Sequence, residues 1–268
     1  MRILLLVLML VSFSCEAAVL TRVAQADYKT TKMTPGRQTL LFAQLTNQSQ
    51  LTIACWVKYN VTDAQAGSAQ GLVSKGVQGG GAAALQFSLN SSGEKMQFRY
   101  ASPDATYHAW QTTANHVQTN EWMHVACSFT YSNANSLKMY VNGTNFSGSW
   151  ASGTGNAVGK TNAVSFHTFV YESGSSLWFI GCMSDLAIWT NTLSAGEVFK
   201  LAKSKVKYMP IQIKPETLLF YYPMDTGKIA LPVTVNIDRD RSPLQTHFEM
   251  DVGGMFYGER TLAYQPNE

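Results

Sequence analysis

LTIACWVKY, at residues 51–59, is the stretch that decides the fold of this chain. Leu51, Ile53 and Cys55 alternate on one face, while the other face also carries large apolar groups such as Trp56. A strand with two largely apolar faces is typical of the middle of a sandwich, where both faces are covered. The stretch therefore predicts a central strand of an all-β protein.

Short strand-like segments separated by turn residues continue beyond this stretch. Residues 84–100 and 122–142 each contain two such segments around a polar turn, which predicts a hairpin in each. Turn signals at this regular spacing favour a two-sheet antiparallel jelly-roll sandwich. One short helix is predicted near residues 194–203, because Ser194 and Glu197 have the spacing of a capping box.

Composition limits the class of protein. Charged residues make up 14% of the 268 residues, aromatic residues make up 12%, and the net charge is +3. Plentiful aromatic side chains exclude a disordered chain. The small positive charge is not clustered, so we expect no nucleic-acid partner.

The N-terminus has the pattern of an export signal. Arg2 precedes an apolar run at residues 3–11, so we expect residues 1–17 to be a signal peptide and the protein to be secreted. This run is too short to cross a bilayer and no later stretch is long enough, so no transmembrane span is expected. Cys15 leaves open the alternative of a cell-surface lipoprotein.

Three cysteines remain once the signal is removed, namely Cys55, Cys127 and Cys182. An odd number in an exported chain leaves two alternatives open: one disulfide with a free or intermolecular thiol, or three buried thiols. Cys55 and Cys127 both lie in the middle of a predicted strand beside apolar neighbours. This pair is therefore the predicted disulfide.

Four ordered segments resemble the laminin-G-like jelly-roll modules of the concanavalin A-like lectin/glucanase superfamily. The matching motifs are Trp56-Val57-Lys58, Trp122-Met123-His124-Val125-Ala126, Tyr140-Val141-Asn142-Gly143, and Gly181 and Asp185 followed by Leu193, Ser194 and Glu197. The resemblance spans residues 40–252 and implies the same sandwich. We therefore expect a single laminin-G-like domain at residues 25–268, with residues 205–268 returning to the same sandwich.

Pentraxins are similar in the same regions and join the two equivalent strands by a disulfide. This similarity also implies a Cys55–Cys127 bridge. Both cysteines, however, stand one residue further along their strands than in the pentraxin pattern, which changes the face that they point to.

The sequence does not carry the catalytic motif of the superfamily's glucanases. Those enzymes place a nucleophile and an acid/base carboxylate on one face of a Glu-x-Asp-x-x-Glu strand, and no such segment occurs here. Residues 155–161 resemble a phosphate-binding loop but are one residue short between the glycines, which argues against nucleotide binding. The chain is therefore expected not to be an enzyme.

Aromatic side chains near predicted loops are the candidate ligand residues, because sugar rings stack on aromatic faces. Tyr107, His108 and Trp110 follow a turn, and Trp150 lies in a polar, Gly-rich stretch. The alternative for the two tryptophans is that they cover the edge of the sandwich as strand residues.

Calcium is the only cofactor that the sequence suggests. Asp238 and Asp240 offer oxygen donors at alternate positions of residues 236–242, although the glycine and distal glutamate of an EF-hand loop are missing. In a eukaryotic host, glycosylation is predicted at five sequons, namely Asn47, Asn60, Asn90, Asn142 and Asn145.

The leading hypothesis is a secreted, non-catalytic, lectin-like module. Its partner would be a glycan or glycoprotein at a cell surface or matrix, bound through loops at the sandwich edge. The alternative is a structural or adhesive subunit that assembles through Cys182 or an exposed strand edge. A glycoside hydrolase is the least favoured of the three.

Overall fold

The alternating stretch that opens the sequence analysis forms β3 (Gln50–Tyr59) in the computed structural model. Backbone and side chains are described for residues 49–59, 69–76, 84–90, 95–160, 179, 183–202 and 209–221. The backbone alone is described at residues 19–26, 31–32, 166–168, 181–182, 203, 222, 236–239, 247–250 and 255–262.

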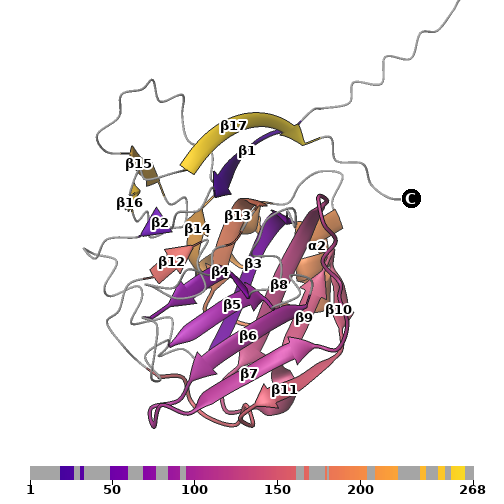
Figure 1. Ribbon diagram of the computed structural model, residues 1–268, viewed down its shortest axis with the longest axis vertical. Helices are drawn as coiled ribbons and strands as arrows, with labels where there is room; N and C mark the ends of the chain where they lie inside the picture. The colour runs from indigo at the N-terminus through magenta and orange to yellow at the C-terminus, as the bar shows by residue number, and fades with distance from the viewer. Residues whose placement is uncertain are drawn as a thin grey trace, which may run out of the picture.

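Two antiparallel sheets make up the fold, as predicted, and Figure 1 shows one in front of the other. Sheet A has the order β10-β9-β8-β3-β13-β1-β17, and β14 also pairs with β13. Besides β3, its strands are β1 (Val19–Ala26), β8 (Trp122–Thr130), β9 (Lys138–Val141), β10 (Thr144–Phe146), β13 (Gly181–Trp189), β14 (Leu218–Tyr222) and β17 (Met255–Leu262).

Sheet B has the order β11-β7-β6-β5-β4-β12-β2. Its strands are β2 (Thr31–Lys32), β4 (Gln70–Lys75), β5 (Leu85–Leu89), β6 (Met96–Ala101), β7 (Tyr107–Thr112), β11 (Gly148–Ser152) and β12 (Phe166–Thr168). A separate hairpin consists of β15 (Asn236–Arg239) and β16 (His247–Met250).

The helical elements of the described residues are short. They are α2 (Ala195–Lys203) and three 3-10 turns, η1 (Ala134–Ser136), η2 (Pro210–Gln212) and η3 (Pro215–Thr217). The predicted capping box begins α2: the Ser194 backbone N–H donates to Glu197 Oε2 over 2.7 Å, and the Glu197 N–H donates to Ser194 Oγ over 3.3 Å. Within the described part of the chain, no helix is long and apolar enough to cross a membrane.

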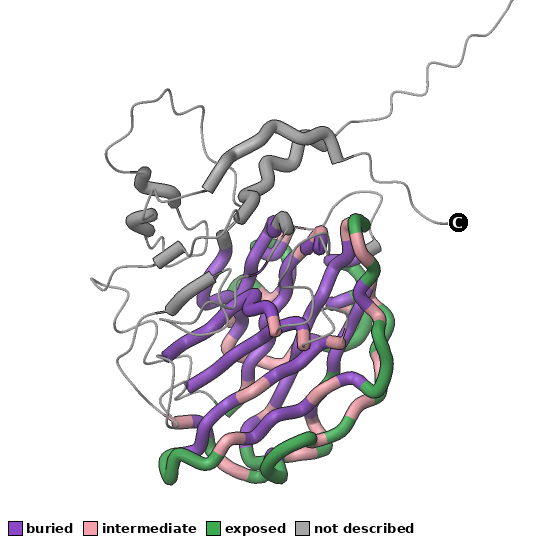
Figure 2. Tube along the Cα trace, in the orientation of Figure 1, coloured by how far each residue is buried: buried purple, intermediate pink, exposed green. Residues whose placement is uncertain are grey.

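The main core lies between the two sheets. Alternate residues of each strand point into it, so that Ile53 of β3 pairs with Cys127 of β8, and Phe87 of β5 pairs with Phe98 of β6. Figure 2 shows these strands buried along most of their length, while the exposed residues gather in the turns and at one margin of the molecule.

One corner of the sandwich is made by a single connecting residue. β10 is the edge strand of sheet A, β11 is the edge strand of sheet B, and only Ser147 separates them in the chain. The Ser147 carbonyl accepts a hydrogen bond from the Thr113 N–H over 3.1 Å. The preceding hairpin turns at Asn142 and Gly143, both at positive φ, which an Asn-Gly pair adopts readily.

The described residues of the C-terminal part contribute β14 and β17 to sheet A. β14 pairs with the second half of β13, and β17 pairs with β1, which in turn pairs with the first half of β13. The domain limits at residues 25–268 stay a prediction. The signal at residues 1–17 lies outside the described residues.

Candidate functional site

The two outward faces of the sandwich differ in chemistry. Sheet A turns small and aromatic side chains outward, such as Ala54, Ala126 and Trp189, and α2 and the following 3-10 turns bury them in a second apolar cluster. Val198 and Leu201 are the α2 residues that face this cluster. The helix therefore covers this face of sheet A.

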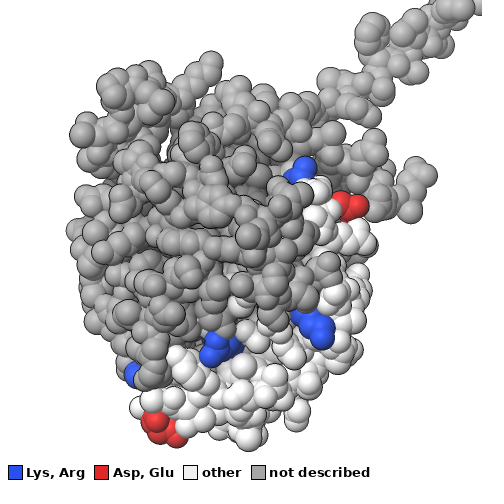
Figure 3. Space-filling model, viewed as in Figure 1, with Lys and Arg blue, Asp and Glu red and all other residues white. Residues whose placement is uncertain are grey.

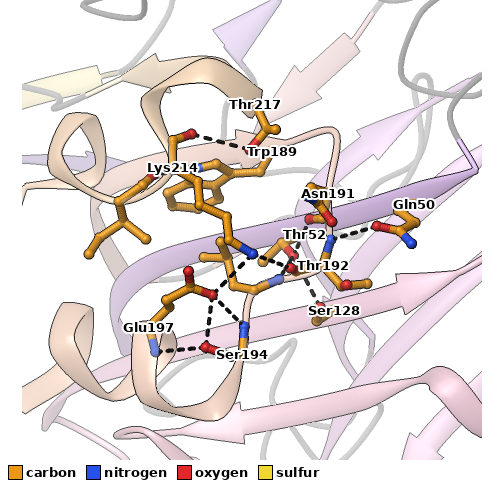
Figure 4. Close-up of polar contacts among 12 residues, drawn as sticks. Gln50, Thr52, Ser128, Trp189, Asn191, Thr192, Ser194, Glu197, Lys214 and Thr217 are labelled. Carbon is orange, nitrogen blue, oxygen red and sulfur yellow. Dashed lines mark hydrogen bonds and ion pairs between the residues drawn. The ribbon is translucent and has the colours of Figure 1, made fainter.

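Polar contacts hold α2 in place over sheet A (Figure 4). Thr52 Oγ1 lies 3.1 Å from Ser128 Oγ, donates to the Asn191 carbonyl over 2.7 Å and accepts from the Leu193 N–H over 3.0 Å. Lys214 Nζ lies 3.3 Å from Glu197 Oε2. Thr52 thus holds the residues just before α2, and the Lys214–Glu197 ion pair joins the first turn of α2 to the segment that follows the helix.

A hollow beside α2 is too small to be a ligand site. Its lining includes Trp56, His124 and Asp185, and it has room for about one water molecule. Asp185 lies at a positive φ within an irregularity of β13, where its carboxylate accepts from Tyr221 Oη over 2.8 Å and from Ser184 Oγ over 2.9 Å. Asp185 thus joins β13 to Tyr221 of the neighbouring strand β14.

The outward face of sheet B is polar. Leu85, Phe87 and Leu89 of β5 point into the core, so the residues between them point outward. Their pairing partners on the neighbouring strands of sheet B point outward as well. We call this surface the polar face; its side chains are Ser74, Gln86, Ser88, Gln97, Arg99, Tyr107, Gln111 and Ser149.

Burial decreases across the polar face from β4 to β11. Ser74, Gln86 and Ser88 are fully buried, whereas Arg99 is half-buried, as are Tyr107 and Gln111, and Ser149 is exposed. We call the last four residues the open end of the polar face. They present a guanidinium, a phenol ring, an amide and a hydroxyl from three adjacent strands.

Contacts within the open end order these side chains. The Arg99 guanidinium lies 4.8 Å from the centre of the Tyr107 ring, and the Asn90 amide donates to Gln111 Oε1 over 2.6 Å. Figure 3 views the molecule from the side on which sheet B lies in front, and the described surface there carries few charged side chains. At the open end, Gln111 and Ser149 offer an amide and a hydroxyl beside the Arg99 guanidinium and the Tyr107 ring.

The predicted ligand residues divide between the two sides of sheet B. Tyr107 points outward, whereas Trp110 is 6% exposed in the core and Trp150, its β11 partner, packs against the same core. His108 is also buried and its ring is stacked on Tyr100 with centres 4.7 Å apart. The two tryptophans therefore do not form the expected outward stacking surface; they close the edge of the sandwich.

The predicted disulfide is wrong. Cys55 and Cys127 are free thiols that point into the same core, but Cys55 pairs with Val125, and Cys127 pairs with Ile53. The two cysteines are therefore diagonal neighbours, about 7–8 Å apart at Cα in such a ladder. A disulfide requires a closer approach of the two Cα atoms.

The predicted metal and glycosylation residues are only partly described. Asp238 lies in β15, with its side chain outside the described residues, and Asp240 lies outside them altogether. No group of three or more potential ligands gathers in the described ranges. Asn47 and Asn60 are not described, Asn145 is exposed, and Asn90 and Asn142 are half-buried.

Residues 34–199, more than half of the sequence, match the model of the concanavalin A-like lectin/glucanases superfamily. The chain belongs to this superfamily. In this protein the superfamily fold is a two-sheet sandwich. A helix covers one of its outward faces, and the other outward face is polar. No curated protein sequence matches the chain.

Solved structures of the superfamily fold are similar to this chain at low identity. A candidate carbohydrate-binding protein from Bacteroides ovatus has a TM-score of 0.60 and 15% identity; the match covers 91% of this chain and 61% of that protein, so the chain spans less than two thirds of its length. The sialyllactose-bound CBM40 of a Ruminococcus gnavus sialidase has a TM-score of 0.50 and 15% identity, covering 67% of this chain and 96% of that module.

Sequence reasoning missed Arg99 and Gln111 as candidate ligand residues. A signal for Gln111 was present, because a strand that turns Trp110 inward turns its neighbours outward. Arg99 lies beside Tyr107 and Gln111 because of the register between β6 and β7. That register cannot be read from the sequence of one strand alone.

Proposed function

We propose that this chain is a non-catalytic glycan-binding protein and that the ligand contacts the open end of the polar face. The observation that carries the proposal is the difference between the outward faces: α2 covers that of sheet A, while sheet B presents amide, hydroxyl and guanidinium groups outward. These groups are suited to the many hydroxyls of a sugar, which both donate and accept hydrogen bonds.

The arrangement does not provide the groups for glycosidic hydrolysis. Both stereochemical courses need two carboxyl groups that flank the scissile bond. The side chains assigned to the polar face contain none. The N-terminal pattern of Arg2 and an apolar run supports an extracellular setting, where glycans are the abundant surface chemistry.

A glycan array, followed by affinity electrophoresis in soluble polysaccharides with calcium or with EDTA, tests the proposal. We expect a glycan that binds, with an affinity that falls about three- to tenfold on Gln111→Ala or Tyr107→Ala, the range for one lost hydrogen bond or ring contact. Gln118→Ala is the matched control, because Gln118 is exposed in the connection after β7.

The absence of binding on the array and in electrophoresis would contradict glycan binding. Binding that survives both substitutions on the polar face, and is lost on another surface, would contradict the location. A requirement for calcium would indicate that a calcium ion takes part in binding, and Asp238→Asn and Asp240→Asn variants would then test the predicted ligands.

A further inference from the structure

The segment that follows β11 is tied to both sheets at one end of the sandwich. Tyr100 Oη donates to the Ala157 carbonyl over 3.0 Å, and the Lys160 N–H donates to the Ala101 carbonyl over 2.6 Å, both on the sheet B side. On the sheet A side, the Ser132 N–H donates to that same Ala157 carbonyl over 3.1 Å. We call residues 153–160 the end loop.

One imidazole holds the start of the end loop. His108 Nδ1 accepts hydrogen bonds from the backbone N–H groups of Thr154 and Gly155, each over 3.1 Å. The loop passes so close that a Cβ on Gly153 would lie 2.5 Å from Nδ1, and one on Gly155 would lie 2.1 Å from the Trp150 ring. Both glycines have positive φ, so this path depends on their lack of a side chain.

Two donors at Nδ1 determine which tautomer His108 adopts. Nδ1 must carry its lone pair, so the neutral ring holds its proton on Nε2. Nε2 is buried and has no hydrogen-bond partner within the described structure. A second proton would have to sit on Nδ1, where it would face two N–H groups and replace two attractive contacts with repulsive ones.

We propose that His108 is a pH-sensitive latch: its neutral form holds the end loop against the sandwich, and its protonation releases the loop.

The surroundings of His108 support the direction of this switch. Burial lowers the pKa of its imidazole, while the carboxylate of Asp104 in the preceding turn opposes the shift. Tyr100 of β6 stacks on His108, Tyr131 after β8 packs on Tyr100, and Lys160 ends the loop. Arg99 of β6 and Tyr107 of β7 belong to the opposite, outward face of sheet B. Burial raises the pKa of Tyr100 and of Tyr131, so both stay neutral when a histidine titrates.

The sign of the pH effect follows from this lowered pKa. A histidine that is harder to protonate in the closed state stabilises that state above its ordinary pKa, near 6.5. The stabilisation is lost as the pH falls through the lower pKa of the closed state. The latch is therefore closed at neutral pH and opens on acidification.

Amide exchange at Thr154 and Gly155, followed by NMR on the full chain from neutral to acidic pH, tests the latch. After correction for the intrinsic pH dependence of exchange, we expect protection of these two amides to fall at least about tenfold, the effect of losing two hydrogen bonds. The fall should follow the protonation of the His108 ring in the same titration. Constant protection through that protonation would overturn the proposal.

Two substitutions separate the latch from general acid unfolding. His108→Gln keeps an acceptor that does not titrate, so the pH dependence at Thr154 and Gly155 should disappear. His116→Gln removes an imidazole away from the loop, whose ring centre lies 3.7 Å from that of Phe146. This control should leave the pH dependence at Thr154 and Gly155 unchanged. An unchanged pH response in His108→Gln would overturn the proposal. If that variant does not fold, the wild-type titration decides alone.

Discussion

At the scale of single residues, the two core thiols are the clearest departure from expectation. Cys55 and Cys127 stand where the strand context predicts a bridge, yet each faces an aliphatic residue of the partner strand. Burial raises the pKa of both thiols far above the usual range, with the Asp185 charge adding a smaller effect at Cys55. Neither forms a thiolate near neutral pH, so both are poor nucleophiles even in an oxidising environment.

The reactivity of these thiols checks the assignment. In a variant with Cys15 and Cys182 replaced by Ser, we expect the folded protein to react with a thiol reagent at least about a hundredfold more slowly than the unfolded protein. Two thiols per chain should then be counted in denaturant without reductant. A count of zero would show that the disulfide forms after all.

At the scale of elements, α2 depends on a few polar contacts at its first turn. Partial burial alone would raise the pKa of the Glu197 carboxyl, but hydrogen bonds from Ser194 and the nearby Lys214 ammonium together lower it. A carboxyl with a lowered pKa stabilises the folded state above its unfolded pKa. This contribution is lost as the pH falls through the lower folded pKa.

Substitutions at the capping box test this contribution. Ser194→Ala should lower the free energy of unfolding by about 1 kcal/mol, whereas Ser194→Thr should keep most of the cap. Glu197→Gln should destabilise the protein at neutral pH, and its difference from wild type should shrink below pH 4.5, the ordinary pKa of the carboxyl. Urea denaturation at neutral pH and at a pH below 4.5 measures these differences in the free energy of unfolding. An equal loss at both would contradict the assigned role of the charge.

Elements were also the level at which sequence was most informative. Alternation in residues 51–59 and the Ser194–Glu197 spacing are local patterns, and β3 and α2 formed where those patterns predicted them. Trp110 shows the limit of reading residues in isolation. Its proximity to a turn suggested exposure, but its position within the alternation of β7 places it in the core.

The candidate site was less predictable, because it depends on contacts between distant parts of the chain. Arg99 and Gln111 join one surface through the pairing of β6 with β7. The diagonal offset of Cys55 and Cys127 likewise follows from the pairing of β3 with β8. Register of this kind is set by packing of the whole sandwich, not by local composition.

At the scale of the whole molecule, the distribution of charge bears on how a ligand is recognised. The net charge is +3, and Arg99 is the charged residue among the side chains assigned to the polar face. Recognition there should rest on hydrogen bonds and ring contacts, which salt screens far less than it screens interactions between exposed charges.

The salt dependence of binding tests this expectation. For an uncharged glycan found on the array, we expect the affinity to change by less than about twofold between low and high salt. Isothermal titration calorimetry at several NaCl concentrations makes the measurement, with Lys138→Ala, on sheet A, as a control for general charge effects. A steep loss of affinity with salt would instead indicate that charges carry the recognition.

The corner at Ser147 has a further consequence for this surface. Because one residue joins the edge of sheet A to the edge of sheet B, neither sheet can slide along the other there without bending the chain at that residue. Gln111 and Ser149 face each other on the two strands beside this corner. Their spacing is set by the pairing of β7 with β11, and the corner ties this edge of sheet B to sheet A before a ligand arrives, which reduces the entropy that binding must remove.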